Sequence, residues 1–217
     1  MVTYRTAVLA AETWPDFEHL FTQGNGWDFC WCTVMQREGP NVKCATRAER
    51  VAVNRRDKRE WFAAGRSHGV LVYADDGAPI GWCQYGRPDE MPVLDRKRGR
   101  FAKPRDLDLP AEDWRITCFV VAKKHRRRGV ATAALRAAIE AIRASGGGIV
   151  EAYPLDPATA DGWGPGTRAD YGHLGVLSMF EAQGFTRVGQ LRQSNAIVRR
   201  TVRRRRLSAA RRARAGA

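Results

Sequence analysis

The sequence lacks any apolar run that approaches the roughly eighteen residues of a transmembrane helix, so we expect no membrane-spanning helix and no membrane partner. Its N-terminus also lacks a basic segment leading into an apolar stretch, so we expect no secretory signal and a cytoplasmic location. With 44% hydrophobic and 28% charged residues, the composition excludes a wholly disordered, collagenous or disulfide-scaffold protein. The 217 residues suffice for the core of one domain with a small extension.

Histidine is scarce, and cysteine lacks the regular spacing of a disulfide framework. An odd number of cysteines at scattered spacings favours reduced thiols over a disulfide framework. One close pair, Cys30 and Cys32, could belong to a zinc or redox site, but no second close pair follows and the four histidines stand alone. We therefore expect no metal. The five cysteines are Cys30, Cys32, Cys44, Cys83 and Cys118.

Acidic residues are missing from residues 199–217, which contain nine arginines and supply most of the net charge of +14. The simplest interpretation of residues 203–217 is a solvated, arginine-rich tail outside the domain. The alternative is weak binding to nucleic acid or another polyanion through this tail. No zinc finger, RNA-recognition aromatic pair or clear helix-turn-helix accompanies the tail.

In the first half of the chain, the patterns predict two helices and a hairpin. Thr46 is a plausible N-cap, and Glu49 three residues later completes a capping box. Asp76 and Gly77 form a turn signal between two apolar runs. The expected elements are helices over 15–21 and 45–62, strands over 70–73 and 80–85, and a long polar loop over 86–113.

In the second half, strands and helices alternate. A β-branched and aromatic run predicts a strand, and apolar residues at helical spacing predict an amphipathic helix after it. A glycine at 184 is a suitable helix end. The expected elements are strands over 114–121 and 149–153, helices from Val130 to about Ala144 and over 174–183, a loop over 154–170, and a final hairpin over 185–192 and 196–202.

The central motif is Arg126-x-x-Gly129-x-Ala131, placed between the strong strand and the amphipathic helix. A helix N-terminus offers backbone N–H groups without internal partners, and the small residues Gly129 and Ala131 let a pyrophosphate approach the backbone. The alternative is an ordinary basic loop before a helix. The motif is neither a Walker loop nor a dinucleotide-binding glycine motif, so a kinase or dehydrogenase is poorly supported.

The segment from Ile116 to Ala131 resembles the acetyl-coenzyme A motif of the GNAT acetyltransferase superfamily. A second segment, Leu177 to Phe185, resembles the superfamily's later helix, which ends in Gly-Phe. The resemblance covers about residues 70–202. It implies a mixed α/β fold with a mostly antiparallel central sheet, splayed between its fourth and fifth strands and flanked by helices. Residues 1–202 would form this single domain, with 1–69 a helical part on the acceptor side.

The resemblance also implies how acetyl-coenzyme A is held as co-substrate. The pantetheine amides would pair with the backbone of the fourth strand, and the pyrophosphate would lie on the backbone amides of the basic turn. The coenzyme-binding residues carried over are Phe119, Val120, Val121, Arg126, Arg127, Arg128, Gly129, Val130, Ala131 and Thr132.

The catalytic residues follow less directly. Attack by an amine on a thioester often needs a proton for the departing thiolate, which the family takes from a tyrosine four residues before the glycine of Gly-Phe. That position is Phe180 here, which cannot donate, and His173, Tyr171 and Ser178 are the substitutes close in sequence. Each could equally decorate or cap the helix.

For the base, the best candidate is Glu151, which has apolar neighbours in the strand over 149–153. If it faces the cleft, burial would raise its pKa. A water chain would make a dedicated base unnecessary. An acceptor pocket could be lined by aromatic side chains, although core packing is their more frequent fate. The aromatic candidates are Trp27, Trp31, Trp82, Trp114, Tyr85 and Tyr153.

Together, these observations predict an N-acetyltransferase that moves the acetyl group of acetyl-coenzyme A to an amine of a small molecule or amino acid. Transfer would be direct, within a ternary complex. Cys118 on the motif strand suggests an acyl-enzyme, but a small buried hydrophobic residue is the better interpretation. The alternative is a non-catalytic acyl-coenzyme A-binding module docked on nucleic acid or a ribosome through the tail. The sequence leaves the acceptor and a homodimer open.

Overall fold

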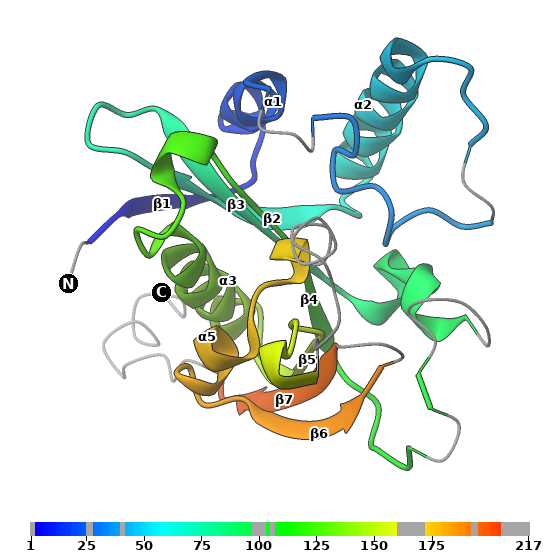
Figure 1. Ribbon diagram of the computed structural model, residues 1–217, viewed down its shortest axis with the longest axis vertical. Coiled ribbons are helices and arrows are strands. Elements are labelled where there is room, and N and C mark those ends of the chain that lie inside the picture. Colours follow the sequence, from blue (N-terminus) through cyan, green and yellow to red (C-terminus); the bar gives the residue numbers. More distant parts are fainter. Residues whose placement is uncertain are drawn as a thin grey trace, which may run out of the picture.

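The computed structural model describes residues 3–24, 28–39, 42–96, 103–104, 107–159, 172–191 and 195–204. In this part of the chain one seven-stranded sheet has the order β1-β2-β3-β4-β5-β7-β6 (Figure 1). The strands are β1 (Arg5–Val8), β2 (His68–Tyr73), β3 (Pro79–Gly86), β4 (Trp114–Val121), β5 (Gly148–Ala152), β6 (Thr186–Gln190) and β7 (Ala196–Val202). The α-helices are α1 (Trp14–Thr22), α2 (Arg47–Ala63), α3 (Val130–Ala144) and α5 (Leu177–Glu181).

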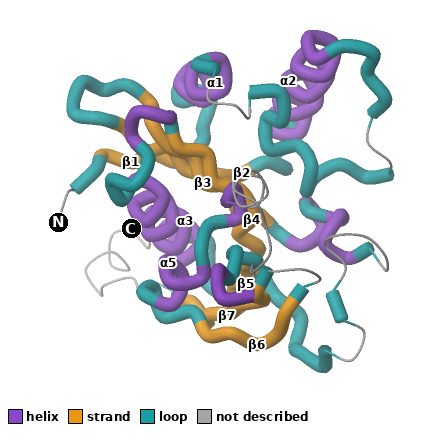
Figure 2. The backbone as a smooth tube through the Cα atoms, in the orientation of Figure 1, coloured by secondary structure: helices purple, strands orange, loops and turns teal. Residues whose placement is uncertain are grey.

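The sheet is mostly antiparallel, and only the central pair, β4 and β5, runs parallel. Helices flank it: Figures 1 and 2 show α1 and α2 on one side of the sheet and α3 and α5 on the other. The predicted mixed α/β fold with a mostly antiparallel central sheet is therefore confirmed.

The pairing of β4 with β5 is short. It covers three residue pairs and ends at Ile116 opposite Ala152, whereas β4 continues to Val121. Beside this point β4 carries one extra residue, Thr117, where its register with β3 shifts between Gln84 and Tyr85. Such a bulge bends a strand and redirects the side chains beyond it. The two halves of the sheet therefore part after Ile116.

Side-chain alternation on β3 shows how the two layers of helices pack. Trp82 meets α1, with its ring centroid 4.6 Å from that of Phe17. Its neighbour Gly81 faces α3, where an added Cβ would lie 2.4 Å from the Cγ1 of Val130. Helix α3 approaches the sheet this closely because position 81 has no side chain.

Apart from the helix over 174–183, the predicted helices and strands are confirmed in place, with shifted ends. The Thr46 side chain accepts from the N–H of Glu49 at 3.1 Å. The Glu49 carboxylate accepts from the N–H of Ala45 at 2.8 Å, one residue before the N-cap. The four-residue edge strand β1 was not predicted, because three of its four side chains are exposed and leave little apolar alternation.

Two predicted segments differ from the structure in detail. The loop over 86–113 contains two short 3₁₀ helices, η1 (Pro88–Glu90) and η2 (Pro92–Asp95), and each begins with a proline, which favours a first helical position. The helix over 174–183 is divided into a 3₁₀ turn, η5 (Gly172–Leu174), and α5, because Gly175 has a left-handed backbone with φ of +80°. Two further 3₁₀ turns are η3 (Lys123–His125) and η4 (Pro157–Thr159).

Candidate functional site

The turn between β4 and α3 prepares a helix N-terminus for an anion. Gly129 is the N-cap of α3 and has a left-handed backbone with φ of +83°, a conformation that glycine adopts without steric cost. The N–H of Ala133 is bonded to the carbonyl of Gly129 at 2.9 Å. The N–H groups of Val130, Ala131 and Thr132 precede that first helical bond, and so point out of the helix without intrahelical acceptors.

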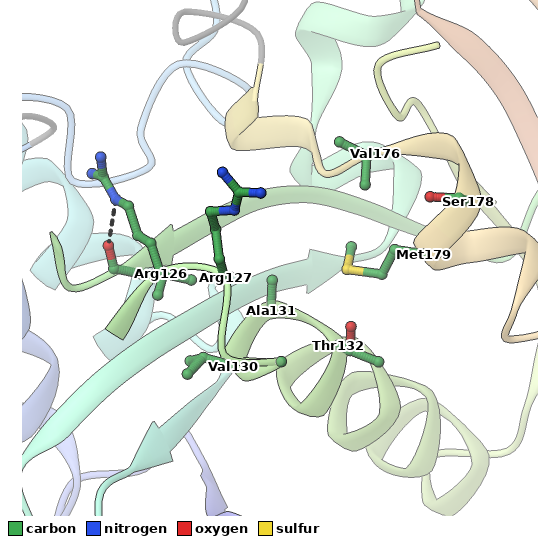
Figure 3. A pocket seen from close by; sticks show the side chains of 10 residues that line it. Arg126, Arg127, Val130, Ala131, Thr132, Val176, Ser178 and Met179 are labelled. Atoms are coloured by element: carbon green, nitrogen blue, oxygen red, sulfur yellow. Dashed lines mark hydrogen bonds between the residues drawn. The ribbon is translucent and has the colours of Figure 1, made fainter. Parts of the chain in front are cut away.

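A pocket of about 390 Å³ opens at this N-terminus. Figure 3 shows the turn and the first residues of α3 on one side and the start of α5 on the other. The Nε of Arg126 donates to the carbonyl of Val121 at 3.2 Å, which fixes the base of that side chain at the pocket rim (Figure 3). The pocket is lined by Val121, Arg126, Arg127, Gly129, Val130, Ala131, Thr132, Val176, Ser178 and Met179.

The edge of β4 next to this pocket is open. Beyond Ile116 no strand in the described part of the chain pairs with β4 on the β5 side. The backbone donors and acceptors of residues 117–121 that face away from β3 are therefore available to a ligand that enters the gap. This edge and the N-terminus of α3 meet at Val121, which lines the pocket.

The turn that borders the pocket is rich in positive charge, and Arg126 and Arg127 line the pocket itself. Residues 123–128 contain two lysines and three arginines, and the next acidic residue along the chain is Glu140. The positive end of the α3 dipole adds to this potential. The combination suits a phosphorylated ligand, since backbone amides bind the anion and side chains attract it.

Most of the residues predicted to bind the coenzyme meet at this pocket. Arg128 is not among the lining residues, and its carbonyl instead accepts a hydrogen bond from the hydroxyl of Tyr4 at 2.8 Å. Phe119 and Val120 are buried, so only their backbone is available to a ligand. Val176 and Met179 were not predicted, although Met179 belongs to the segment from Leu177 to Phe185 that resembles the later helix and Val176 directly precedes it.

The candidate proton donors lie in different places. Ser178 is exposed on α5 and lines the pocket, whereas His173 is half-buried in η5, which packs against β4. Tyr171 lies outside the described residues. Phe180 is fully buried, with its ring edge-on to Phe119 and to Phe185 at centroid distances of 6.0 and 5.2 Å.

Glu151 is fully buried on the face of the sheet opposite α3, because its neighbours Val150 and Ala152 pack into the core beside that helix. Its Oε2 accepts from the Nε of Arg199 at 2.7 Å, and its Oε1 lies 2.6 Å from the Nζ of Lys103. The hydroxyl of Tyr153 also donates to Oε1. Burial, and then the charge of Glu151, raise the pKa of Tyr153, which keeps that hydroxyl protonated.

Glu112 completes this cluster from the segment before β4. It accepts from Lys103 at 2.7 Å, from the Nε of Arg115 at 2.8 Å and from Arg199 at 3.1 Å. Burial would raise the pKa of Glu112, but the hydrogen bonds from Lys103 and Arg115 outweigh it and lower this pKa to about 2. We call Glu112, Glu151, Lys103, Arg115 and Arg199 the carboxylate–cation cluster. Only Glu151 was predicted as functional; the other members carry no motif in the sequence.

The aromatic residues considered for an acceptor pocket are core residues wherever the structure describes them. Trp27 lies outside the described residues. The other five are buried at 0–6% exposure: Trp31, Trp82, Trp114, Tyr85 and Tyr153. Core packing, the more frequent fate of such rings, accounts for these five.

No group of three or more His, Cys, Asp or Glu side chains among the described residues has a metal-site arrangement. Cys32 approaches Cys118 on β4 rather than its sequence neighbour Cys30. Nor does any helix in the described ranges have the length and apolar character needed to span a membrane.

Comparison with solved structures finds proteins that share this architecture. A protein from Corynebacterium glutamicum, described as histone acetyltransferase HPA2 and related acetyltransferase, aligns with a TM-score of 0.51 and 13% identity over 96% of this chain and 100% of its own. A phosphinothricin acetyltransferase from Sinorhizobium meliloti, in complex with acetyl-coenzyme A, has a TM-score of 0.49 and 16% identity over 93% of this chain and 90% of its own. An acetyltransferase from Thermus thermophilus has a TM-score of 0.47 and 17% identity over 92% of this chain and 97% of its own.

At such identities, structural likeness by itself speaks only for the fold. A search of curated proteins finds no significant match. The sequence does match the model of the acetyltransferase (GNAT) family over residues 9–160, which is more than half of the chain and contains the whole basic turn and α3. The chain therefore belongs to the GNAT acetyltransferase family.

Proposed function

We propose that this acetyltransferase moves the acetyl group of acetyl-coenzyme A to an amine of a small molecule or amino acid, by direct attack in a ternary complex. One observation carries the proposal: the open edge of β4 and the free amides of α3 border a single pocket of about 390 Å³. A ligand with amides at one end and phosphates at the other matches both.

Each end of the pocket has a role in this proposal. The amides of residues 126–132 would hold the pyrophosphate, and Arg126 and Arg127 would attract it. The backbone of Phe119, Val120 and Val121 would pair with the pantetheine arm as an additional strand would. The thioester would then lie in the gap where β4 leaves β5.

For the departing thiolate we propose Ser178 as the proton donor, since its hydroxyl lies in the pocket wall while Phe180 points into the core. His173 beside β4 is the second candidate. A neutral thiol leaves more readily than a thiolate, and general-acid help is typically worth about 10²–10⁴-fold.

For the acceptor ammonium we propose Glu151 as the base. Its side chain lies on the face of the sheet opposite α3, and the acceptor would approach from that face. Lys103 and Arg199 hold its carboxylate in place, at 2.6 and 2.5 Å. The hydroxyl of Tyr153, which donates to the same carboxylate, or a water would relay the proton.

The experiment that tests this function is incubation of the full-length chain with acetyl-coenzyme A and a panel of amines and amino acids. Free coenzyme A and acetylated product are quantified together by mass spectrometry, which separates transfer from simple hydrolysis. We expect both to form in equal amounts with at least one amine. Tight coenzyme binding in calorimetry with no product from any amine would instead support a non-catalytic acyl-coenzyme A-binding module.

A further inference from the structure

Two cysteines far apart in the sequence meet beneath α1 and α2. The Sγ atoms of Cys32 and Cys118 lie 2.6 Å apart, and both residues are buried, at 3% and 7% exposure. Cys32 belongs to the segment between the two N-terminal helices, whereas Cys118 lies on β4 directly before the predicted coenzyme strand segment. Contact between these sulfurs makes them a pair rather than two isolated core thiols.

The backbone beside Cys32 is strained. Trp31 and Cys32 have left-handed backbones with φ of 51° and 49°, a region that bulky residues rarely occupy. Strain of this kind persists only where the surroundings hold it, and it concentrates at functional positions. Here Phe17 and Phe21 provide these surroundings, because the buried ring of Trp31 packs on both. This backbone conformation directs the Cys32 side chain at β4.

A buried cation lies beside the pair. Lys58 of α2 is fully buried, and its ammonium donates to the Oε1 of Gln36 at 2.6 Å. Within the described ranges no carboxylate lies at ion-pair distance from it. Burial lowers the pKa of Lys58 to about 8, partly offset by the neighbouring cysteines and Glu90. An unmatched buried ammonium favours an anion nearby.

The surroundings of Cys32 favour its thiolate, which would be this anion. Burial by itself would raise the pKa of the Cys32 thiol, but contact with Cys118, the charge of Lys58 and the indole of Trp82 outweigh it and lower this pKa. The N–H of Trp82 is buried without an acceptor in good hydrogen-bond geometry among the described residues, so a thiolate would be its natural partner. By contrast, burial raises the pKa of Cys30 to about 11 and that of Cys83 well above its usual value.

We propose that Cys32 and Cys118 form a redox-active dithiol that a small peroxide oxidises to a disulfide linking the N-terminal segment to β4. In the first step the Cys32 thiolate attacks one peroxide oxygen and becomes a sulfenic acid, and the other oxygen leaves as hydroxide. In the second step the Cys118 sulfur attacks the sulfenic sulfur, and water leaves with the sulfenic oxygen. With hydrogen peroxide, two thiols and one peroxide yield one disulfide and two waters.

The bond would affect the part of β4 that borders the coenzyme pocket, because Cys118 immediately precedes Phe119. It would also fasten the segment between α1 and α2 to the sheet. The inference does not depend on the proposed acetyl transfer, because the sulfur contact, the buried cation and the unpaired indole N–H are independent of any substrate.

The test uses the full-length chain, reduced, freed of reductant and treated with one equivalent of hydrogen peroxide. Remaining thiols are alkylated in denaturant, and tryptic peptides are identified by mass spectrometry. We expect two alkylatable thiols to disappear and the peptide ending at Arg37 to be joined to the peptide from Ile116 to Lys123. Reductant should restore both. Because Cys30 shares the first peptide, the experiment is repeated with Cys30→Ser, which should retain the link.

Single variants separate the two steps. In Cys118→Ser the Cys32 sulfenic acid lacks its proposed partner, so dimedone should label Cys32. In Cys32→Ser neither dimedone labelling nor a link should form. Lys58→Met removes the cation and should slow dimedone labelling of the Cys118→Ser chain roughly tenfold, the effect of one unit in a thiol pKa. Circular dichroism checks that each variant is folded.

Several outcomes would overturn the proposal. It fails if folded wild type retains five alkylatable thiols after peroxide, or if the link joins Cys30 or Cys83 instead. It also fails if peroxide links Cys32 to Cys118 equally well in denaturant, since the folded environment would then play no part. Should Lys58→Met not fold, the comparison of Cys118→Ser with Cys83→Ser in dimedone labelling still decides whether Cys32 is the reactive thiol.

Discussion

Arg199 on β7 donates from its Nε to the Oε2 of Glu151 on β5 at 2.7 Å, directly across the pair of strands. The same guanidinium reaches Glu112 at 3.1 Å, in the segment that leads into β4. One arginine therefore ties together both halves of the splayed sheet. Because the carboxylates and the cations hold each other, loss of one member leaves an uncompensated buried charge.

Glu151→Gln removes one of these charges and so has two expected effects. Breaking a buried ion pair from one side destabilises the fold by roughly 3 kcal/mol, measured by urea unfolding. If Glu151 is also the base, kcat/KM should fall by about 10²–10⁴-fold at a temperature where the variant is folded. That loss should shrink as pH rises, since more of the amine is then neutral without enzymic help.

The control for stability is Glu140→Gln, because Glu140 is exposed and its pair with Arg143 lies on the surface of α3. It should change the free energy of unfolding by less than about 1 kcal/mol. The affinity for coenzyme A, measured by calorimetry, is the control for activity and should stay near wild type. A folded Glu151→Gln enzyme with full activity at every pH would leave the cluster a purely structural role.

Acid should weaken the protein through Glu112. Its pKa is lowered to about 2 in the folded state, below its ordinary value of 4.5, so the unfolded chain binds the proton first. The stability that Glu112 contributes is complete above about pH 4.5 and is lost as pH falls towards 2. In Glu112→Gln the fall in melting temperature across this window should be smaller than in wild type. An unchanged slope would mean that other carboxylates dominate acid unfolding.

Gly129→Glu should weaken coenzyme A binding at least tenfold, about 1.4 kcal/mol, as measured by calorimetry. A carboxylate at the N-cap of α3 would stand where we place the pyrophosphate, in open space bordering the pocket. The matched control is Gly77→Glu, at a left-handed glycine of similar φ (+85° against +83°) with open space around it, in the β2–β3 turn. Equal weakening by both variants, or by neither, would place the pyrophosphate elsewhere.

Ser178→Ala should lower kcat by about 10²-fold or more while the affinity for coenzyme A stays the same, if Ser178 supplies the proton to the thiolate. Single-turnover measurements would show the loss in the chemical step. Phe180→Tyr serves as the comparison. Its hydroxyl would enter the core beside Phe119 and Phe185 rather than the pocket, so it should not rescue Ser178→Ala. Rescue by Phe180→Tyr would return the donor role to that position.

Removal of residues 205–217 takes away Arg205, Arg206, Arg211, Arg212 and Arg214 but none of the pocket residues. We expect near-normal turnover and weaker binding to double-stranded DNA, with a smaller dependence on salt because fewer counterions are released. Fluorescence anisotropy at several salt concentrations measures this dependence. A folded truncation without turnover would show that the tail helps to build the site.

The sequence predicted the elements whose patterns are local. The periodic apolar face of α3, the β-branched run of β4 and the Arg126-x-x-Gly129 turn depend on neighbours within a few residues, so they could be recognised without the fold. Glu151 was singled out for its apolar surroundings. Its ion-pair partners Lys103 and Arg199 come from two distant segments, and only the folded sheet brings them together.

The cysteines show the same limit. The short spacing from Cys30 to Cys32 suggested one site in the sequence, but the left-handed backbone at Trp31 and Cys32 turns the second thiol towards Cys118, which is 86 positions away. Likewise, the division of the helix over 174–183 depends on Gly175. A Cβ added there would lie 2.8–3.3 Å from side-chain atoms of Met179, Phe180 and Phe119. Packing constraints of this kind have no signature in a single sequence.

The three residue pairs between β4 and β5 make the centre of the sheet its weakest seam. The sheet therefore consists of two parts, β1–β4 and β5–β7, joined by this short parallel pairing, and α3 packs against both parts. A ligand hydrogen-bonded along the open edge of β4 would stabilise the two parts of the sheet relative to each other. The rigidity of the whole sheet, and the rate at which its central amide hydrogens exchange with solvent, would then depend on whether the cleft is filled.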